Sequence, residues 1–117
     1  MSELYRRMQC FLGDQQKLME RMAGRLDLWE ECVGLFPGEE ILEEMDAVLQ
    51  AGDMKQFYGC VHRLKGNLAN FGFDPAAELA MAVLAALRED NLAEAKIQYL
   101  QLRTVYGQIA ERLRDTE

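Results

Sequence analysis

Residues 53–73 read DMKQFYGCVHRLKGNLANFGF, and this stretch decides the fold. Its apolar side chains recur at steps of three and four, the spacing that places them on one face of an α-helix. They are Phe57, Val61, Leu64, Leu68 and Phe71. Asp53 with Gln56 three residues later resembles a capping box, and Gly72 ends the run. We therefore expect a helix from Asp53 to Gly72 that packs through this stripe on other helices.

Three further segments show the same helical spacing. The first runs from Glu39 to Ala51 and precedes Gly52, a residue suited to ending a helix. A second opens at Asp74-Pro75, read as an N-cap residue before a proline at the first helical position, and ends near Asp90. The last opens at Asn91 and continues to about Arg114. Because short connections make neighbouring helices antiparallel, these segments predict an antiparallel four-helix bundle over residues 39–115.

The N-terminal part of the chain predicts additional helices. Residues 1–25 carry an apolar helical rhythm that Gly13-Asp14 interrupts, so we expect one long or broken N-terminal helix there. Asp27 and Glu30 resemble a capping box that opens a short second helix, which Phe36-Pro37 ends. Trp29, Phe57 and Phe71 are expected in the core. The predicted fold class is all-α: a single domain over residues 1–117, formed by the bundle and an additional N-terminal helical segment.

Composition and charge exclude several classes of protein. The formal net charge of −7 argues against nucleic-acid binding, which needs a basic surface. The apolar run Leu79–Leu87 is far shorter than the roughly 20 residues that span a bilayer, and no secretory signal follows the N-terminus, so we expect a cytoplasmic protein. Cys10, Cys32 and Cys60 fit no disulfide framework and are expected to be reduced, mostly buried thiols. A monomer is expected, because a single bundle can bury the apolar stripes of its own helices.

His62 is the single histidine and falls in the middle of the helix expected from Asp53 to Gly72. At about 100° per residue it points almost opposite the apolar stripe, so it should face solvent. Gly59, Gly66 and Ala69 share its face. Two glycines inside a helix cost about 1 kcal/mol each relative to alanine. A partner backbone that approaches the imidazole closely would explain this cost.

The residues around His62 suit phosphoryl chemistry. A neutral imidazole nitrogen is nucleophilic near pH 7 and can pass a phosphoryl group onward. Lys65, at the edge of the same face, can bring an ammonium group toward an anion on the ring. The chain has no glycine-rich or Walker-type nucleotide loop, so ATP binding is not expected. The phosphoryl group must therefore come from a partner and return to one.

The sequence His62-Arg-Leu-Lys-Gly66, followed by Phe71-Gly-Phe73, resembles the signature of histidine phosphotransfer domains in multistep two-component phosphorelays. The resemblance extends from about Ala23 to the end of the chain. It implies that His62 accepts the phosphoryl group, that Lys65 neutralises it and that Gly66 allows docking. It also implies a phosphocarrier rather than an enzyme, without a cofactor of its own.

The resemblance further implies the partner. This is the receiver domain of a response regulator, of a hybrid sensor histidine kinase, or of both, and Mg²⁺ is expected on that receiver. The predicted docking residues are Gly59, Gly66, Ala69, Asn70, Tyr58 and Arg63.

Other interpretations of the histidine remain open. Asn67 and Asn70 depart from the family pattern, and the apolar helix that follows offers no polar partner for the second ring nitrogen, unless one of these asparagines or water serves. The chain could therefore be a degenerate helical interaction module that has kept the family's shape. A zinc site at Cys60 and His62 is disfavoured because residues two apart on a helix diverge. A haem bound by His62 would require the ring to face inward.

Overall fold

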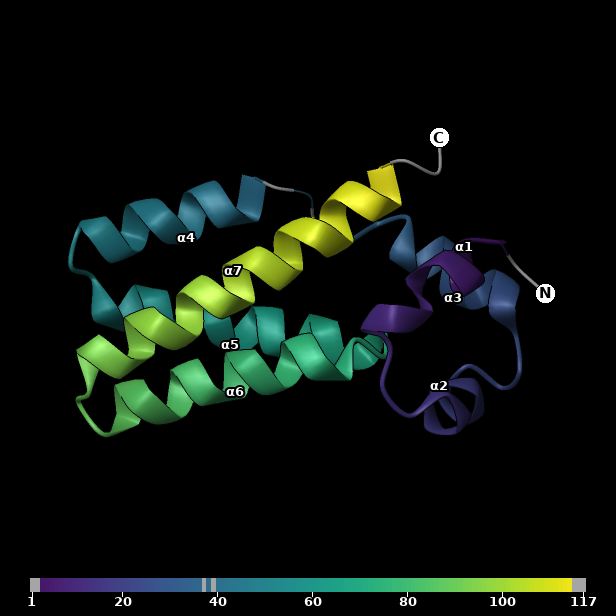
Figure 1. Cartoon of the computed structure of the whole chain (residues 1–117), viewed down its shortest axis with the longest axis horizontal. Helices are drawn as coiled ribbons and strands as arrows, with labels where there is room; N and C mark the ends of the chain where they lie inside the picture. The colour runs from purple at the N-terminus through teal and green to yellow at the C-terminus, as the bar shows by residue number, and fades with distance from the viewer. Residues whose placement is uncertain (1–2, 37, 39, 115–117) are drawn as a thin grey trace.

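The computed structural model describes residues 3–36, 38 and 40–114 (Figure 1). All regular elements in these ranges are helices, so the predicted all-α class is confirmed. Four helices form the bundle: α4 (Glu40–Gln50), α5 (Met54–Asn70), α6 (Asp74–Arg88) and α7 (Leu92–Arg114). The most extensive contacts join α6 to α7 and α5 to α6. None of the helices in the described ranges is long and apolar enough to cross a membrane.

The helix containing His62 begins where its sequence predicts and ends at Asn70, just before the predicted end at Gly72. The Asp53 carboxylate accepts a hydrogen bond of 3.1 Å from the backbone N–H of Gln56. Gly52, just before it, has a φ of +77°, a conformation that glycine adopts without strain. Helix α7 begins with the same kind of capping hydrogen bond: the side-chain oxygen of Asn91 accepts from the backbone N–H of Glu94 over 3.1 Å. Local capping therefore sets the start of both helices.

Two predicted helix starts are shifted by one or two residues. The N-cap of α6 is Phe73, not Asp74, which lies inside the helix. The Asp74 carboxylate is thereby free to accept a hydrogen bond of 3.2 Å from the backbone N–H of Asp14. Helix α3 (Leu26–Val33) begins after Arg25, and Asp27 lies in its first turn. Asp27 pairs with the Arg25 guanidinium at 2.7 Å and does not cap the helix.

The N-terminal segment is broken into short helices rather than forming one. Helix α1 (Glu3–Met8) continues into a 3-10 turn, η1 (Gln9–Phe11), and α2 (Gln15–Arg21) follows. The interruption at Gly13-Asp14 is where the sequence predicts it, because the Asp14 carboxylate caps α2 through the N–H of Lys17. Helices α1, α2 and α3 gather at one end of the bundle, beside the turn that joins α5 to α6 (Figure 1). We call residues 3–36 the N-terminal cover.

Polar contacts attach the N-terminal cover to the α5–α6 turn. The backbone N–H of Gly13 donates to the carbonyl oxygen of Gly72 over 3.0 Å. The indole N–H of Trp29, which is fully buried, donates to the carbonyl oxygen of Phe71 over 2.9 Å. These bonds satisfy backbone groups that a turn would otherwise leave unpaired. The cover therefore fixes the end of the helix that carries His62.

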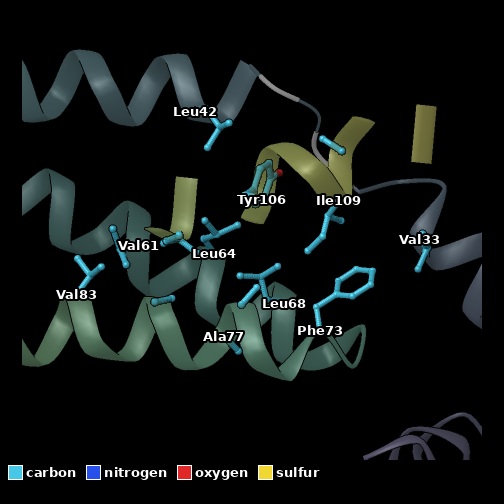
Figure 2. Close-up of a cluster of buried hydrophobic side chains, with 14 of the residues drawn as sticks. Val33, Leu42, Val61, Leu64, Leu68, Phe73, Ala77, Val83, Tyr106 and Ile109 are labelled. Carbon is cyan, nitrogen blue, oxygen red and sulfur yellow. The ribbon is translucent and has the colours of Figure 1, made fainter. Parts of the chain in front are cut away.

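One continuous core runs from the bundle into the cover. Figure 2 shows its inner part, where Val61, Leu64 and Leu68 of α5 lie among side chains of α6 and α7, with Val33 of the cover at one side of the cluster. Trp29 and Phe57 are buried as expected, and Phe71 packs at the edge of the core. The expectation that the cysteines are mostly buried is wrong: Cys60 is buried, Cys32 is half-buried and Cys10 is exposed. Cys10 lies in η1 on the outer side, where the Arg112 guanidinium contacts its sulfur at 3.1 Å.

Candidate functional site: the histidine face of α5

His62 lies exposed in the middle of α5. Its neighbours Val61 and Leu64 are fully buried, so the helix turns its apolar side to the core and the imidazole to solvent. The helix on either side of His62 is held by this packing, which fixes the position of its backbone. A haem interpretation requires an inward imidazole, and the exposed position of the ring contradicts it.

Two glycines on the face of the imidazole have open space around them. A Cβ atom added at Gly59 or at Gly66 would meet no atom within 4 Å outside the helix itself. Neither glycine has a positive φ, so neither the backbone conformation nor packing requires it. These glycines lower the stability of the helix, and no close contact within the described part of the chain explains why they are there. This is the pattern expected where another molecule approaches the helix closely.

The histidine helix carries positive charge in an acidic protein. Its charged side chains are Lys55, Arg63 and Lys65, and α5 contains no aspartate or glutamate, although the whole chain has a formal net charge of −7. Lys65 is half-buried, one turn from His62, and Arg63 is exposed. The Arg63 guanidinium contacts the Cys60 sulfur at 3.5 Å. The charge on the face around His62 is therefore suited to an anion.

The structure distributes the other predicted docking residues along the same helix. Ala69 is half-buried and Asn70 is exposed, both in the last turn of α5. Their carbonyl oxygens accept hydrogen bonds from the Arg21 guanidinium of α2, at 2.6 and 3.1 Å. The N-terminal cover therefore borders the end of this face, a neighbour that sequence reasoning did not identify.

Tyr58, one turn before His62, packs against the imidazole. The two ring centroids are 6.4 Å apart and the ring planes differ by 19°, a stacked arrangement. The Nε–H of Arg88, at the end of α6, donates a hydrogen bond of 2.8 Å to the Tyr58 hydroxyl. Sequence reasoning missed Arg88. The available signal lies in the pairing of two helices and not in α5 alone, since Tyr58 and Arg88 lie at nearly equal distances on either side of the Gly72 turn and so come to the same end of an antiparallel pair.

Within the described residues, the ring nitrogens of His62 have no hydrogen-bond partner. Across residues 3–36, 38 and 40–114, no side chain forms a hydrogen bond with the imidazole, and Asn67 and Asn70 do not serve as such partners. Ala80 and Leu84 of α6 are buried and apolar. Both nitrogens are therefore available to an incoming molecule or to water.

Comparison with protein families identifies the class of the protein. The model of the Hpt domain family matches residues 37–115, more than half of the chain, and the chain therefore belongs to this family. Hpt domains are phosphocarrier modules of phosphorelays. Comparisons with curated proteins and with solved structures gave no match. The described residues contain no group of three or more histidine, cysteine, aspartate or glutamate side chains arranged to hold a metal ion.

Proposed function

We propose that this protein carries a phosphoryl group on His62, accepting it from a phospho-aspartyl receiver domain and passing it to another in a two-component phosphorelay. The observation that carries the proposal is an exposed imidazole midway along a packed helix, between two glycines that neither packing nor backbone conformation requires. Membership of the Hpt domain family supports the same reading.

The chemistry needs an unprotonated imidazole nitrogen. That nitrogen attacks the phosphorus of the aspartyl phosphate, the N–P bond forms, and the P–O bond breaks to release the aspartate as a carboxylate. Transfer onward reverses these events on a second receiver. The exposed ring allows the attacking nitrogen and the phosphorus to meet in line.

Charge on α5 supports both transfer and docking. Lys65 offsets part of the roughly two negative charges that the phosphoryl group brings. Lys65 and Arg63 flank the histidine on a helix without acids, which complements the acidic phosphorylation site of a receiver. Gly59, Gly66, Ala69, Asn70, Tyr58 and Arg63 form the proposed docking surface.

The proposal assigns the remaining chemistry to the partner. Mg²⁺ acts on the receiver, and the carrier itself uses no cofactor and no ATP. We also propose that residues 1–117 fold as one domain and act as a monomer, since one continuous core joins the N-terminal cover to the bundle.

Transfer from a phosphorylated receiver domain tests the proposal. The protein is mixed with cognate receivers charged by acetyl phosphate, and its intact mass is measured at neutral pH. We expect one added phosphoryl group that is acid-labile, maps to His62 and is absent in His62→Gln. Circular dichroism of His62→Gln should match the unmodified protein, because the side chain lies outside the core.

A charge-matched pair tests the role of Lys65. Lys65→Gln should slow transfer by about tenfold, the effect of losing one charge-assisted contact to the phosphoryl group. Lys96→Gln removes the same charge from an exposed position on α7 and should leave the rate unchanged. A protein that binds receivers but takes no label on His62 would instead be a helical interaction module, and the proposal would be wrong.

A further inference from the structure

We propose that Tyr58 is a positioning residue for the His62 imidazole and that Arg88 holds Tyr58 in place. This inference rests on the proposed function of His62. It assigns to Tyr58 an action on the ring in addition to contact with the partner.

The stacked pair is the first observation. The rings of Tyr58 and His62 lie nearly parallel, with 19° between their planes and 6.4 Å between their centroids. This separation is within the range in which aromatic pairs attract each other. Because the residues are four apart on one helix, the tyrosine ring restricts the angles at which the imidazole can stand.

The second observation is what holds the tyrosine. The Arg88 Nε–H donates to the Tyr58 hydroxyl over 2.8 Å, which joins α6 to α5. The guanidinium carbon is 5.6 Å from the tyrosine ring centroid, near the outer limit of about 6 Å for cation–π attraction, so the hydrogen bond is the principal contact. Within the described residues Arg88 forms no ion pair with a carboxylate. The Arg88 guanidinium therefore has no competing carboxylate among the described residues and remains directed at the Tyr58 hydroxyl.

The third observation is that the part of the chain that the structure describes offers the imidazole no hydrogen-bond partner and no second aromatic contact. None of the described side chains hydrogen-bonds its nitrogens, and the glycines on its face offer no side chain. Phosphoryl transfer requires the attacking nitrogen in line with the breaking bond, and a small misplacement of a reacting group slows a reaction strongly. Among the described side chains, the Tyr58 ring is thus the one that sets the orientation of the His62 imidazole.

The environment of Tyr58 makes this role testable by substitution. Tyr58 is half-buried at the edge of the bundle, where it borders a surface hollow of about 360 Å³ that Leu87 and Leu92 also line. Its removal enlarges an open hollow and does not empty the core. The variants should therefore fold.

Three variants separate the parts of the arrangement. Tyr58→Leu removes the ring, Tyr58→Phe keeps the ring without the hydroxyl, and Arg88→Gln keeps a donor at the end of α6 without the charge. We expect Tyr58→Leu to lower the transfer rate at saturating phosphorylated receiver by about three- to tenfold, the range that aromatic stacking energies correspond to. Tyr58→Phe and Arg88→Gln should lower it by about twofold or less. Leu92→Ala is the matched control, since it enlarges the same hollow without touching Tyr58's contact to the histidine, and should leave the rate unchanged.

Two further readouts distinguish positioning from docking or folding. The affinity for an unphosphorylated receiver should change by less than about twofold in Tyr58→Phe and by less than the rate does in Tyr58→Leu. In NMR spectra of the free protein, the His62 ring protons should show cross-peaks to the Tyr58 ring and a ring-current shift that Tyr58→Phe keeps and Tyr58→Leu loses.

The outcomes separate this inference from the proposed function. A wild-type transfer rate in Tyr58→Leu, or the absence of cross-peaks between the rings in the unmodified protein, would overturn the positioning role while His62 still carries the phosphoryl group. The absence of label on His62 in the unmodified protein would overturn the proposed function, and this inference with it.

Discussion

The Arg21 guanidinium donates to the carbonyl oxygen of Ala69 over 2.6 Å and to that of Asn70 over 3.1 Å. The last carbonyl groups of a helix have no partner within it, and a cation there also interacts favourably with the helix dipole. Arg21 belongs to the N-terminal cover, outside the residues matched by the Hpt family, whereas Ala69 and Asn70 end the histidine helix. The cover therefore completes a helix that the family match contains.

We predict that Arg21→Gln destabilises the protein. Loss of a charged hydrogen bond at an exposed helix end should lower the free energy of unfolding by about 1 kcal/mol. Urea denaturation followed by circular dichroism measures the change. Lys17→Gln removes the same charge from an exposed position on the same helix and serves as the control. Equal losses in both variants would show that net charge, not the contact with α5, is responsible.

Alanine at Gly59 or Gly66 should stabilise the protein and impair transfer. Each replacement should raise the free energy of unfolding by about 0.5–1 kcal/mol, because the added methyl group meets nothing and the backbone loses less entropy on folding. The same methyl groups stand on the proposed docking surface, so transfer from the receiver should slow. Gly107→Ala, in the open on α7, should give the gain in stability without the loss of transfer. If Gly59→Ala and Gly66→Ala transfer as fast as Gly107→Ala, close approach of a partner at these positions is wrong.

Gly72→Ala should be more destabilising than Gly52→Ala. Both glycines have positive φ values, +84° and +77°, so both pay the backbone cost of a side chain in this conformation, about 1 kcal/mol. At Gly72 the added Cβ would also lie 2.7 Å from a methyl carbon of Leu18, whereas at Gly52 it would meet no atom within 4 Å. The difference between the two unfolding free energies therefore measures how tightly α2 of the cover packs on the α5–α6 turn. A difference of zero would contradict that packing.

Stability should fall in acid through Asp46. Burial raises the pKa of its carboxyl group, but hydrogen bonds from Arg103 and Tyr99 outweigh burial and lower that pKa below its ordinary value of 3.8. The folded protein therefore favours the carboxylate more than the unfolded chain does. Its contribution is fully present above about pH 4 and is lost as the pH falls through the pKa of the folded protein.

The comparison with Asp46→Asn isolates this effect. The free energy of unfolding of the variant should lie about 1–2 kcal/mol below that of the unmodified protein at pH 7. The two values should converge as the pH is lowered below 4. A difference that stays constant with pH would show that the carboxylate charge does not matter.

Much of the fold follows from local sequence. Asp53 and Asn91 accept hydrogen bonds from the backbone where the capping rules place them, and the helices that follow run close to their predicted lengths. The apolar spacing also predicts that Leu64 is buried and His62 exposed, which the structure confirms. These features depend on residues within one or two turns of each other, so a single sequence contains the information.

The errors arise where distant segments compete for the same group. Asp74 is a residue type that favours the N-cap position. The turn at Gly72 brings it to the backbone of Asp14, and its carboxylate accepts a hydrogen bond from the Asp14 N–H instead. For Tyr58 the docking role stays a prediction, and what the sequence missed is its partner on α6. Its hydrogen bond with Arg88 depends on how α6 returns along α5, which the spacing within one helix does not contain.

The stacking of Phe36 on Tyr106, with centroids 5.2 Å apart, crosses the boundary at which the family match begins. Phe36 also meets Phe73 edge to face at 5.7 Å. The residues matched by the family model therefore share their core with Phe36, which lies outside the match. A fragment trimmed to the matched residues would expose the rings of Tyr106 and Phe73 that Phe36 covers, and it would be prone to self-association. A transfer of this Hpt domain into another protein should therefore include the N-terminal cover.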